Sequence, residues 1–283
     1  MQISQQDNAS WWNARPMTYD WDGVIAAPPG TPEFFEQSDR RAIEAHRPFG
    51  HPAYPADPPY SRLIDWQGAR GQRILEIGCG LGLHATLFAS AGARVVTMDL
   101  TETAVKLTRA RCSQKGIAVG IVRADGERLP YPAACFDQVW SWGVIHHSAN
   151  TPAIVAEIRR VLRPGGLFRA MVYHRRSVRY WIVGGLQHGL VRGKLLTRTL
   201  EEVNQTFTDG AIARHYTVSE ARELLGEFEP PRFRILQEAG SEALPKISPL
   251  LRRISPALAK RFDAWVNARF GWFLFWETRK PAA

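Results

Sequence analysis

Four residues at alternating positions, Glu76, Gly78, Gly80 and Gly82, carry the clearest chemical signal in this 283-residue sequence. Glycine has no Cβ, so a run of glycines lets the backbone turn tightly and approach a ligand closely. Residues 73–77 read as a buried strand, and a carboxylate near its end lies at the carboxyl edge of the sheet, where open α/β folds bind ligands. The pattern predicts a turn that holds a nucleotide-like ligand.

The glycine spacing separates two classes of ligand. A dinucleotide fingerprint counted from Gly78 requires its third glycine at position 83, where this chain has Leu83. The pattern is instead E-x-G-x-G-x-G, which excludes the ordinary dinucleotide site. A plain tight turn between a strand and a helix is the alternative interpretation.

Two further carboxylates follow expected strands. Asp99 ends the segment 94–99, where a carboxylate can accept hydrogen bonds from both hydroxyls of a ribose or can cap the next helix. Asp125 follows the segment 119–123 and can accept from an adenine amino group, and Gly126 beside it lets the backbone come close.

A third marker lies in residues 136–147, which read as a strand followed by Ser141, Trp142 and the pair His146 and His147. Together with Leu-Pro-Tyr-Pro at 129–132 and Leu-Arg-Pro-Gly-Gly at 162–166, the motifs resemble class I S-adenosylmethionine (SAM) dependent methyltransferases. The resemblance is to the small-molecule branch, the ubiquinone and menaquinone biosynthesis type, and it covers about residues 72–172. It implies an enzyme that uses SAM, releases S-adenosylhomocysteine (SAH) and methylates an O, N or C atom of a small molecule.

The resemblance also assigns roles to residues. Glu76 would face the methionine amino group, the glycines would make room for methionine and ribose, and Leu100 would pack on the adenine. The expected cofactor contacts are Glu76, Gly78, Cys79, Gly80, Gly82, Asp99, Leu100, Ala124, Asp125, Gly126 and Trp142. No metal is expected.

Methyl transfer is an in-line displacement, and a general base helps when the acceptor must lose a proton. The candidates are His146, His147, His174 and His215, since an imidazole titrates near neutral pH. His146 is the first choice because it follows the fourth strand, although such histidines can equally pack a helix start. The expected acceptor contacts are Tyr19, Trp21, His146, Tyr173 and Tyr180, with simple core packing as the alternative.

The tetrapeptide Asp57-Pro58-Pro59-Tyr60 spells the signature of enzymes that methylate exocyclic or amide nitrogens. In those families it ends the fourth strand, whereas here it precedes the first. We interpret it as a turn in the N-terminal region.

Composition supports an ordinary globular protein, with 45% hydrophobic and 22% charged residues. The sequence shows no apolar stretch of membrane-spanning length and no signal peptide. The three cysteines lack metal-ligand spacing and indicate a reducing compartment, so we expect a cytoplasmic protein without disulfides.

The net charge of +9 could favour nucleic acid, anionic lipid or an acidic substrate. The basic residues are scattered, so we expect a solvated basic face and no specific nucleic acid. Residues 246–265 mix apolar and basic positions as an interfacial helix would, which leaves peripheral membrane contact and a lipid or quinone-like acceptor as an alternative. Pro249 and Pro256 favour a packed helix hairpin instead. A non-catalytic SAM-binding protein is the third possibility.

These residues need an alternating framework to hold them. The predicted fold is α/β, a Rossmann-like and mostly parallel sheet of seven strands with an antiparallel last strand. Strands are expected at 73–77, 94–99, 119–123, 136–140, 167–173, 232–238 and 272–278. Helices are expected at 31–46, 83–91, 103–115, 152–162 and 218–225. The predicted regions are an N-terminal cap at 1–70, a SAM-binding core at 71–174, a substrate-covering insertion at 175–216, and a completing segment at 217–283 with a helical insertion at 245–268.

Overall fold

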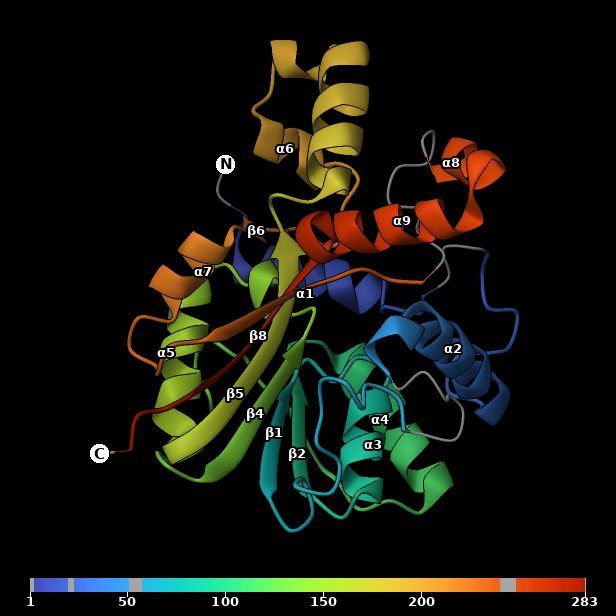
Figure 1. Cartoon of the computed structure of the whole chain (residues 1–283). Coiled ribbons are helices and arrows are strands. Elements are labelled where there is room, and N and C mark those ends of the chain that lie inside the picture. The colour runs from blue at the N-terminus through green and yellow to red at the C-terminus, as the bar shows by residue number, and fades with distance from the viewer. Residues whose placement is uncertain (1–2, 20–22, 51–57, 240–247, 283) are drawn as a thin grey trace.

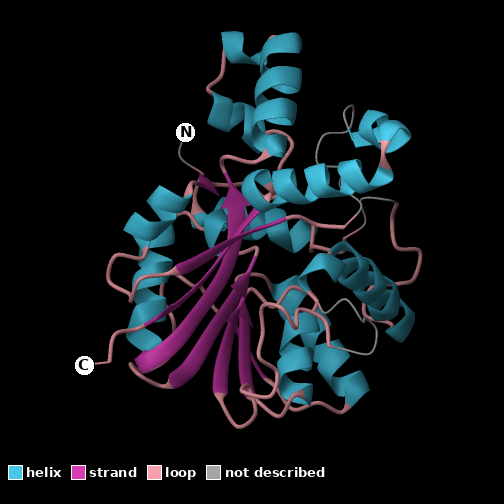
Figure 2. Cartoon of the chain, viewed as in Figure 1, coloured by secondary structure: helices cyan, strands magenta, loops and turns pink. Residues whose placement is uncertain are grey.

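The computed structural model describes residues 3–19, 23–50, 58–239 and 248–282. Its centre is a mixed sheet with the order β3-β2-β1-β4-β5-β8-β7, in which a two-residue strand, β6, pairs separately with β5 (Figures 1 and 2). The strands are β1 (Arg73–Ile77), β2 (Arg94–Asp99), β3 (Gly120–Arg123), β4 (Phe136–Trp142), β5 (Leu162–His174), β6 (His215–Tyr216), β7 (Arg232–Leu236) and β8 (Phe273–Arg279).

The strand directions confirm the predicted fold class. The pairs among β1 to β5 are parallel, and β8 runs antiparallel to both β5 and β7. Such an arrangement places the carboxyl ends of β1, β2, β4 and β5 at one edge of the sheet. The short β6 lies at the end of the insertion expected over 175–216 and was not predicted as a strand. It pairs Tyr173 with His215 at that edge.

Helices cover both faces of the sheet (Figure 1). The helices are α1 (Gln5–Ala14), α2 (Pro32–Ala45), α3 (Leu83–Ser90), α4 (Glu102–Lys115), α5 (Thr151–Val161), α6 (Leu200–Gln205), α7 (Val218–Leu224), α8 (Ser248–Ile254) and α9 (Pro256–Phe270). One core packs α5 and α7 on the sheet through side chains such as Ile154, Ile158 and Ala221. A second core packs Ala85 and Phe88 of α3 on the other face.

Local signals explain where α4 begins and ends. The Thr101 hydroxyl accepts a hydrogen bond from the Ala104 N–H, and Gly116 adopts the left-handed conformation that follows many helices. Both features flank the helix that was expected at 103–115. Helix α1, in contrast, was not predicted. Ser4 and Asp7 form a capping box at its start, which a search for S-x-x-D would have found.

The insertion after β5, for which no helix was predicted, is largely helical. A 13-residue π-helix, η3 (Arg179–Val191), leads through a short turn to α6, and the two pack together as the projection at the top of Figure 1. Gly184 allows this packing, because a Cβ there would lie 2.3 Å from the Asn204 side-chain oxygen.

The C-terminal helices α8 and α9 pack against each other, with Ser255 capping α9 and Pro256 in its first turn. The packed hairpin favoured by Pro249 and Pro256 is therefore observed over the described residues 248–270. Within the described part of the chain, no helix combines the length and apolarity needed to cross a bilayer.

Candidate functional site

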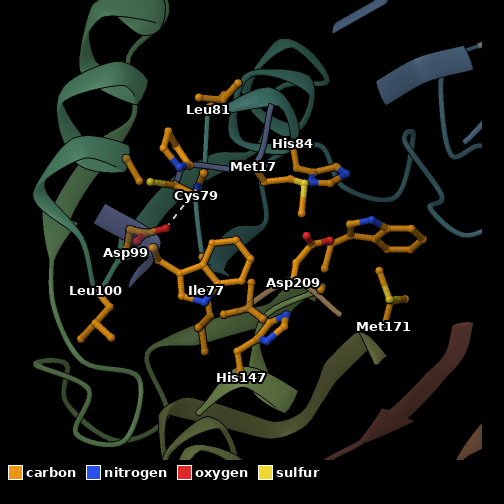
Figure 3. Close-up of a pocket in the computed structure, with 18 of the residues that line it drawn as sticks. Met17, Ile77, Cys79, Leu81, His84, Asp99, Leu100, His147, Met171 and Asp209 are labelled. Atoms are coloured by element: carbon orange, nitrogen blue, oxygen red, sulfur yellow. Dashed lines mark hydrogen bonds between the residues drawn. The ribbon is translucent and has the colours of Figure 1, made fainter. Parts of the chain in front are cut away.

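A large cavity opens at the carboxyl edge of the sheet, beneath α1, α2 and the insertion. Figure 3 shows Cys79, Asp99 and Leu100 on one side of it and Met171 and Asp209 on the other. We call the first side, with Gly78, Gly80, Asp99, Leu100, Ala124 and Gly126, the glycine-turn half. We call the second side, with Tyr19, His46, Trp142, Tyr173, Asp209, Glu238, Trp272 and Phe273, the aromatic half.

Backbone hydrogen bonds hold the glycine turn in place. The N–H groups of Gly78 and Cys79 both donate to the Met98 carbonyl, at 2.8 and 2.9 Å, which ties the end of β1 to β2. Gly78 has φ +84°, and a Cβ there would lie 2.1 Å from Val144. Gly80 has φ +50° with nothing within 4 Å of its Cβ position, so the backbone there lies open to the cavity.

Asp99 shapes the floor of this half. Its Oδ2 accepts from the Gly80 N–H at 3.2 Å, and its Oδ1 accepts from the Thr101 N–H and hydroxyl at 2.9 and 2.8 Å. A carboxylate offers about four acceptor positions, so Oδ2 keeps one for a ligand hydroxyl. Burial raises the pKa of Asp99 despite these hydrogen bonds.

Several expected cofactor residues occupy other positions. Glu76 is buried under the turn, where its carboxylate accepts from the Thr97 hydroxyl at 2.6 Å and lies 3.6 Å from His84 Nδ1. Gly82 starts α3, and Asp125 accepts from the Gln5 side chain at 2.8 Å. These three residues are not among the described residues that line the cavity.

Helix α1 closes the glycine-turn half and supplies an unmet acceptor. Asn8 lines the cavity and is 4% exposed, and its Oδ1 has no hydrogen-bond partner among the described residues. A buried amide oxygen costs stability unless a donor reaches it. The orphan oxygen, the open backbone at Gly80 and the remaining position on Asp99 together fit a ligand with several hydroxyl and amino donors.

The aromatic half consists of rings from distant segments. The ring centroid of Trp142 in β4 lies 6.3 Å from that of Phe273 in β8, and the ring centroid of Tyr173 in β5 lies 4.7 Å from that of Trp272. Tyr19, which we expected as an acceptor contact, and Trp142, which we expected at the cofactor, both line this space. Tyr180 is buried against His215 rather than along the cavity, and Trp21 lies outside the described residues.

The histidine pair separates into two environments. His147 lines the cavity, and its Nδ1 donates to the Ile212 carbonyl, which places the lone pair of the neutral ring on Nε2. Burial lowers its pKa to about 4. His146 is fully buried behind it, and neither of its ring nitrogens has a partner within the described structure.

The other two candidate bases also lie away from the cavity lining that the structure describes. His174 Nδ1 contacts the Gly271 carbonyl at 3.0 Å, and His215 is stacked on Tyr173. Of the predicted bases, His147 is therefore the one that the fold brings to the cavity. Asn8, His46, Asp209 and Glu238 are among the lining residues that sequence reasoning missed, and of these only Asn8 lay near a local signal, the capping box of α1.

Comparison with known proteins identifies the family. Residues 75–170 match the family model described as "Methyltransferase domain". The chain is 30% identical over 171 residues to the ubiquinone biosynthesis O-methyltransferase of Aromatoleum aromaticum, which covers 58% of this chain and 72% of that protein. The chain belongs to the class I SAM-dependent methyltransferases.

Other matches within this methyltransferase family cover less of the relatives. The chain is 37% identical over 99 residues to the 27-O-demethylrifamycin SV methyltransferase of Amycolatopsis mediterranei, which is 34% of this chain and 36% of that protein. For three of the curated relatives that it matches, the chain spans between 36% and 59% of the relative's length.

Solved structures support the fold. The [4+2]-cyclase SpnF aligns with a TM-score of 0.57 at 17% identity, covering 99% of this methyltransferase chain and 97% of the cyclase. A SAM-dependent methyltransferase from Mesorhizobium loti aligns with a TM-score of 0.51 at 21% identity, over 75% and 92% of the two chains. SAM is the family's cofactor, and the donor-rich ligand that the glycine-turn half fits is of that kind.

Proposed function

We propose that this chain transfers a methyl group from SAM to an O, N or C atom of a small molecule bound in the aromatic half. The observation that carries the proposal is the continuity of one cavity, which joins the glycine turn to the aromatic rings past His147. SAM, when bound, supplies an electrophilic methyl group on a sulfonium.

Different residues of the chain would bind the cofactor, exclude water and orient the acceptor. Gly78, Gly80, Asp99 and Leu100 would hold the cofactor, with α1 excluding water above them. Positioning two reactants in line can lower a barrier by roughly 7–11 kcal/mol. The rings of Trp142 and Tyr173 would orient the acceptor.

His147 is the base that this geometry favours. Its Nδ1–H is fixed on the Ile212 carbonyl, so the Nε2 lone pair could take the acceptor's proton as the new bond forms. A pKa of about 4 keeps the ring neutral at physiological pH, although it also makes the base weak. His147 therefore suits an acceptor that is itself acidic or that needs only a hydrogen bond.

The proposal is tested with tritium-labelled SAM and a cell extract. We expect label in the low-molecular-weight fraction with the full chain, and a large loss with Asp99→Asn. The matched control is Glu102→Gln, whose carboxylate is 54% exposed and pairs with Lys106. Label only in protein or RNA, or no label while SAH binds in calorimetry, would contradict a small-molecule methyltransferase; the latter result would favour a non-catalytic SAM-binding protein.

Peripheral membrane contact remains a separate prediction. It is supported by exposed apolar side chains on α8 and α9, namely Leu250, Ile254, Leu258 and Trp265. Co-sedimentation with vesicles should increase with anionic lipid content if these helices contact a membrane. Binding that ignores anionic lipid, or no binding, would remove this alternative.

A further inference from the structure

A buried chain of polar groups reaches the aromatic half from the N-terminal region. His46 follows α2, is 3% exposed, and has its Nδ1 2.7 Å from the Tyr60 hydroxyl. Its Nε2 lies 3.5 Å from Glu238 Oε1, two residues beyond β7. A backbone hydrogen bond from the Ala239 N–H to the Ala45 carbonyl, 2.7 Å long, fixes these two distant segments together.

The protons in this chain have one consistent arrangement. Burial raises the pKa of Tyr60 well above its usual value, so the phenol keeps its proton and donates it to His46 Nδ1. Burial lowers the pKa of His46, so the ring is neutral and carries its one proton on Nε2, toward Glu238. The chain of hydrogen-bond donors that runs from Tyr60 through His46 therefore ends at the carboxylate of Glu238, which lines the cavity.

The charged lining of the cavity is mostly acidic, in contrast to the net charge of +9 for the whole chain. Asp39 pairs with the buried Arg111, and Asp99 belongs to the glycine-turn half. Within the aromatic half, the charged lining that the structure describes is Asp209, Glu238 and Arg179. The Arg179 guanidinium lies over the Trp272 ring, 4.9 Å from its centroid.

The two carboxylates act on the same part of the cavity. Burial is the main cause of the raised pKa of Tyr173. The charge of Asp209 adds to it, Arg179 lowers it, and Glu238 makes a smaller addition. Figure 3 shows Asp209 pointing into the cavity from the side of Met171. Glu238 lies beside His46, and the ring centroid of His46 is 5.3 Å from that of Trp142. A space with two carboxylates and several aromatic faces is suited to a cation, which both kinds of group attract.

We propose that the aromatic half selects an acceptor that carries a protonated amine beside a flat apolar body. Asp209 and Glu238 would receive the ammonium, and Trp142, Tyr173 and Phe273 would contact the body. The inference rests on the proposed methyl transfer, because it names the class of molecule that the same cavity would methylate.

The test compares three small probes on the full chain saturated with SAH, so that the cofactor side is filled in every titration. Phenethylamine is the cation, phenethyl alcohol replaces the ammonium by a hydroxyl, and phenylpropanoate replaces it by a carboxylate. We expect phenethylamine to bind about 10- to 100-fold more tightly than phenethyl alcohol, the range for a hydrogen bond to a charged group. Phenylpropanoate should bind more weakly than either.

Two variants assign the preference to the named carboxylates. Glu238→Gln should remove most of the advantage of phenethylamine, and Asp209→Asn should reduce it independently, so that one remains informative if the other does not fold. Glu36→Gln is the matched control, because that side chain is 72% exposed on α2 and pairs with Arg40. It should leave the preference unchanged.

The outcomes separate the two proposals. If SAH fails to bind to the folded chain, the proposed methyl transfer is wrong. If SAH binds but phenethylamine binds no more tightly than phenethyl alcohol, the amine preference is overturned and methyl transfer stands. An unchanged preference in both Glu238→Gln and Asp209→Asn would also overturn it.

Discussion

The two halves of the cavity are built in different ways. The glycine-turn half uses residues 78–126, where consecutive strands β1, β2 and β3 deliver their ends side by side. The aromatic half collects side chains from seven separate segments between Tyr19 and Phe273. The first half is formed by short segments at the ends of neighbouring parallel strands, whereas the second half forms only when the whole chain has folded.

The halves also differ in what holds them. Backbone hydrogen bonds such as those from Gly78 and Cys79 to Met98 fix the glycine turn. Packed rings and buried neutral histidines fix the aromatic half. Changes in the first half should therefore act on cofactor affinity, and changes in the second on the acceptor and the rate.

The largest expected effect is at His147, where the halves meet. His147→Gln should lower the rate of tritium transfer by about 10², the low end of the usual contribution of a general base because a pKa of about 4 makes His147 a weak one, while SAH affinity stays within about threefold. His188→Gln on η3 is the control. A rate within about threefold of the unchanged chain, combined with a loss in His146→Ala, would return the role to His146.

The second prediction concerns the backbone of the glycine turn. Gly78→Ala forces a Cβ against Val144 at φ +84°, whereas Gly71→Ala meets φ +76° with nothing within 4 Å. Both pay the left-handed penalty of about 1–2 kcal/mol. Only Gly78→Ala should add an overpacking cost of about 1–3 kcal/mol and lose SAH binding. Equal melting temperatures and equal SAH affinities would show that the contact with Val144 does not matter.

A third change weakens the cofactor side at Asp99, a side chain whose two oxygens accept from the Gly80 and Thr101 N–H groups. Asp99→Asn should reduce SAH affinity by about 10- to 100-fold, because it removes a charged hydrogen-bond acceptor. The KM for the acceptor should hardly change, since Asp99 does not reach the aromatic half. Calorimetry with SAH measures the effect, with Glu102→Gln as control. An equal loss of acceptor affinity would contradict the separation of the halves.

The smallest effect is on stability at mildly acid pH. Burial lowers the pKa of His147 to about 4 and of His215 to about 3, from 6.5 in the unfolded chain. The unfolded chain therefore binds protons first as the pH falls. The stability that neutral histidines contribute is complete above about pH 6.5 and is lost as the pH falls toward 4.

Hydrogen exchange can locate that loss. Between pH 7 and pH 5, corrected for intrinsic rates, protection should decrease more around residues 145–147 and 173–174 than around 78–82. His215→Phe should make the change shallower. A uniform decrease over both halves would show that the histidines do not set the acid sensitivity of the aromatic half.

Local signals predicted much of the framework. The alternation of apolar strands with helices predicted β1 and β2 at their observed bounds and α4 to within one residue of its start. The helices of the insertion were harder to predict, because η3 and α6 depend on their packing at Gly184 and carry no periodic pattern of apolar residues. Such contacts between distant segments leave no periodic trace in the sequence.

The sequence by itself determined the family, through motifs over about residues 72–172. It also indicated most of the glycine-turn half, because parallel strands bring their carboxyl ends to one edge. Only the tertiary structure decided which histidine of the pair enters the cavity. It also brought His46 to Glu238 across 192 residues, since side-chain direction and long-range pairing depend on packing that no local pattern records.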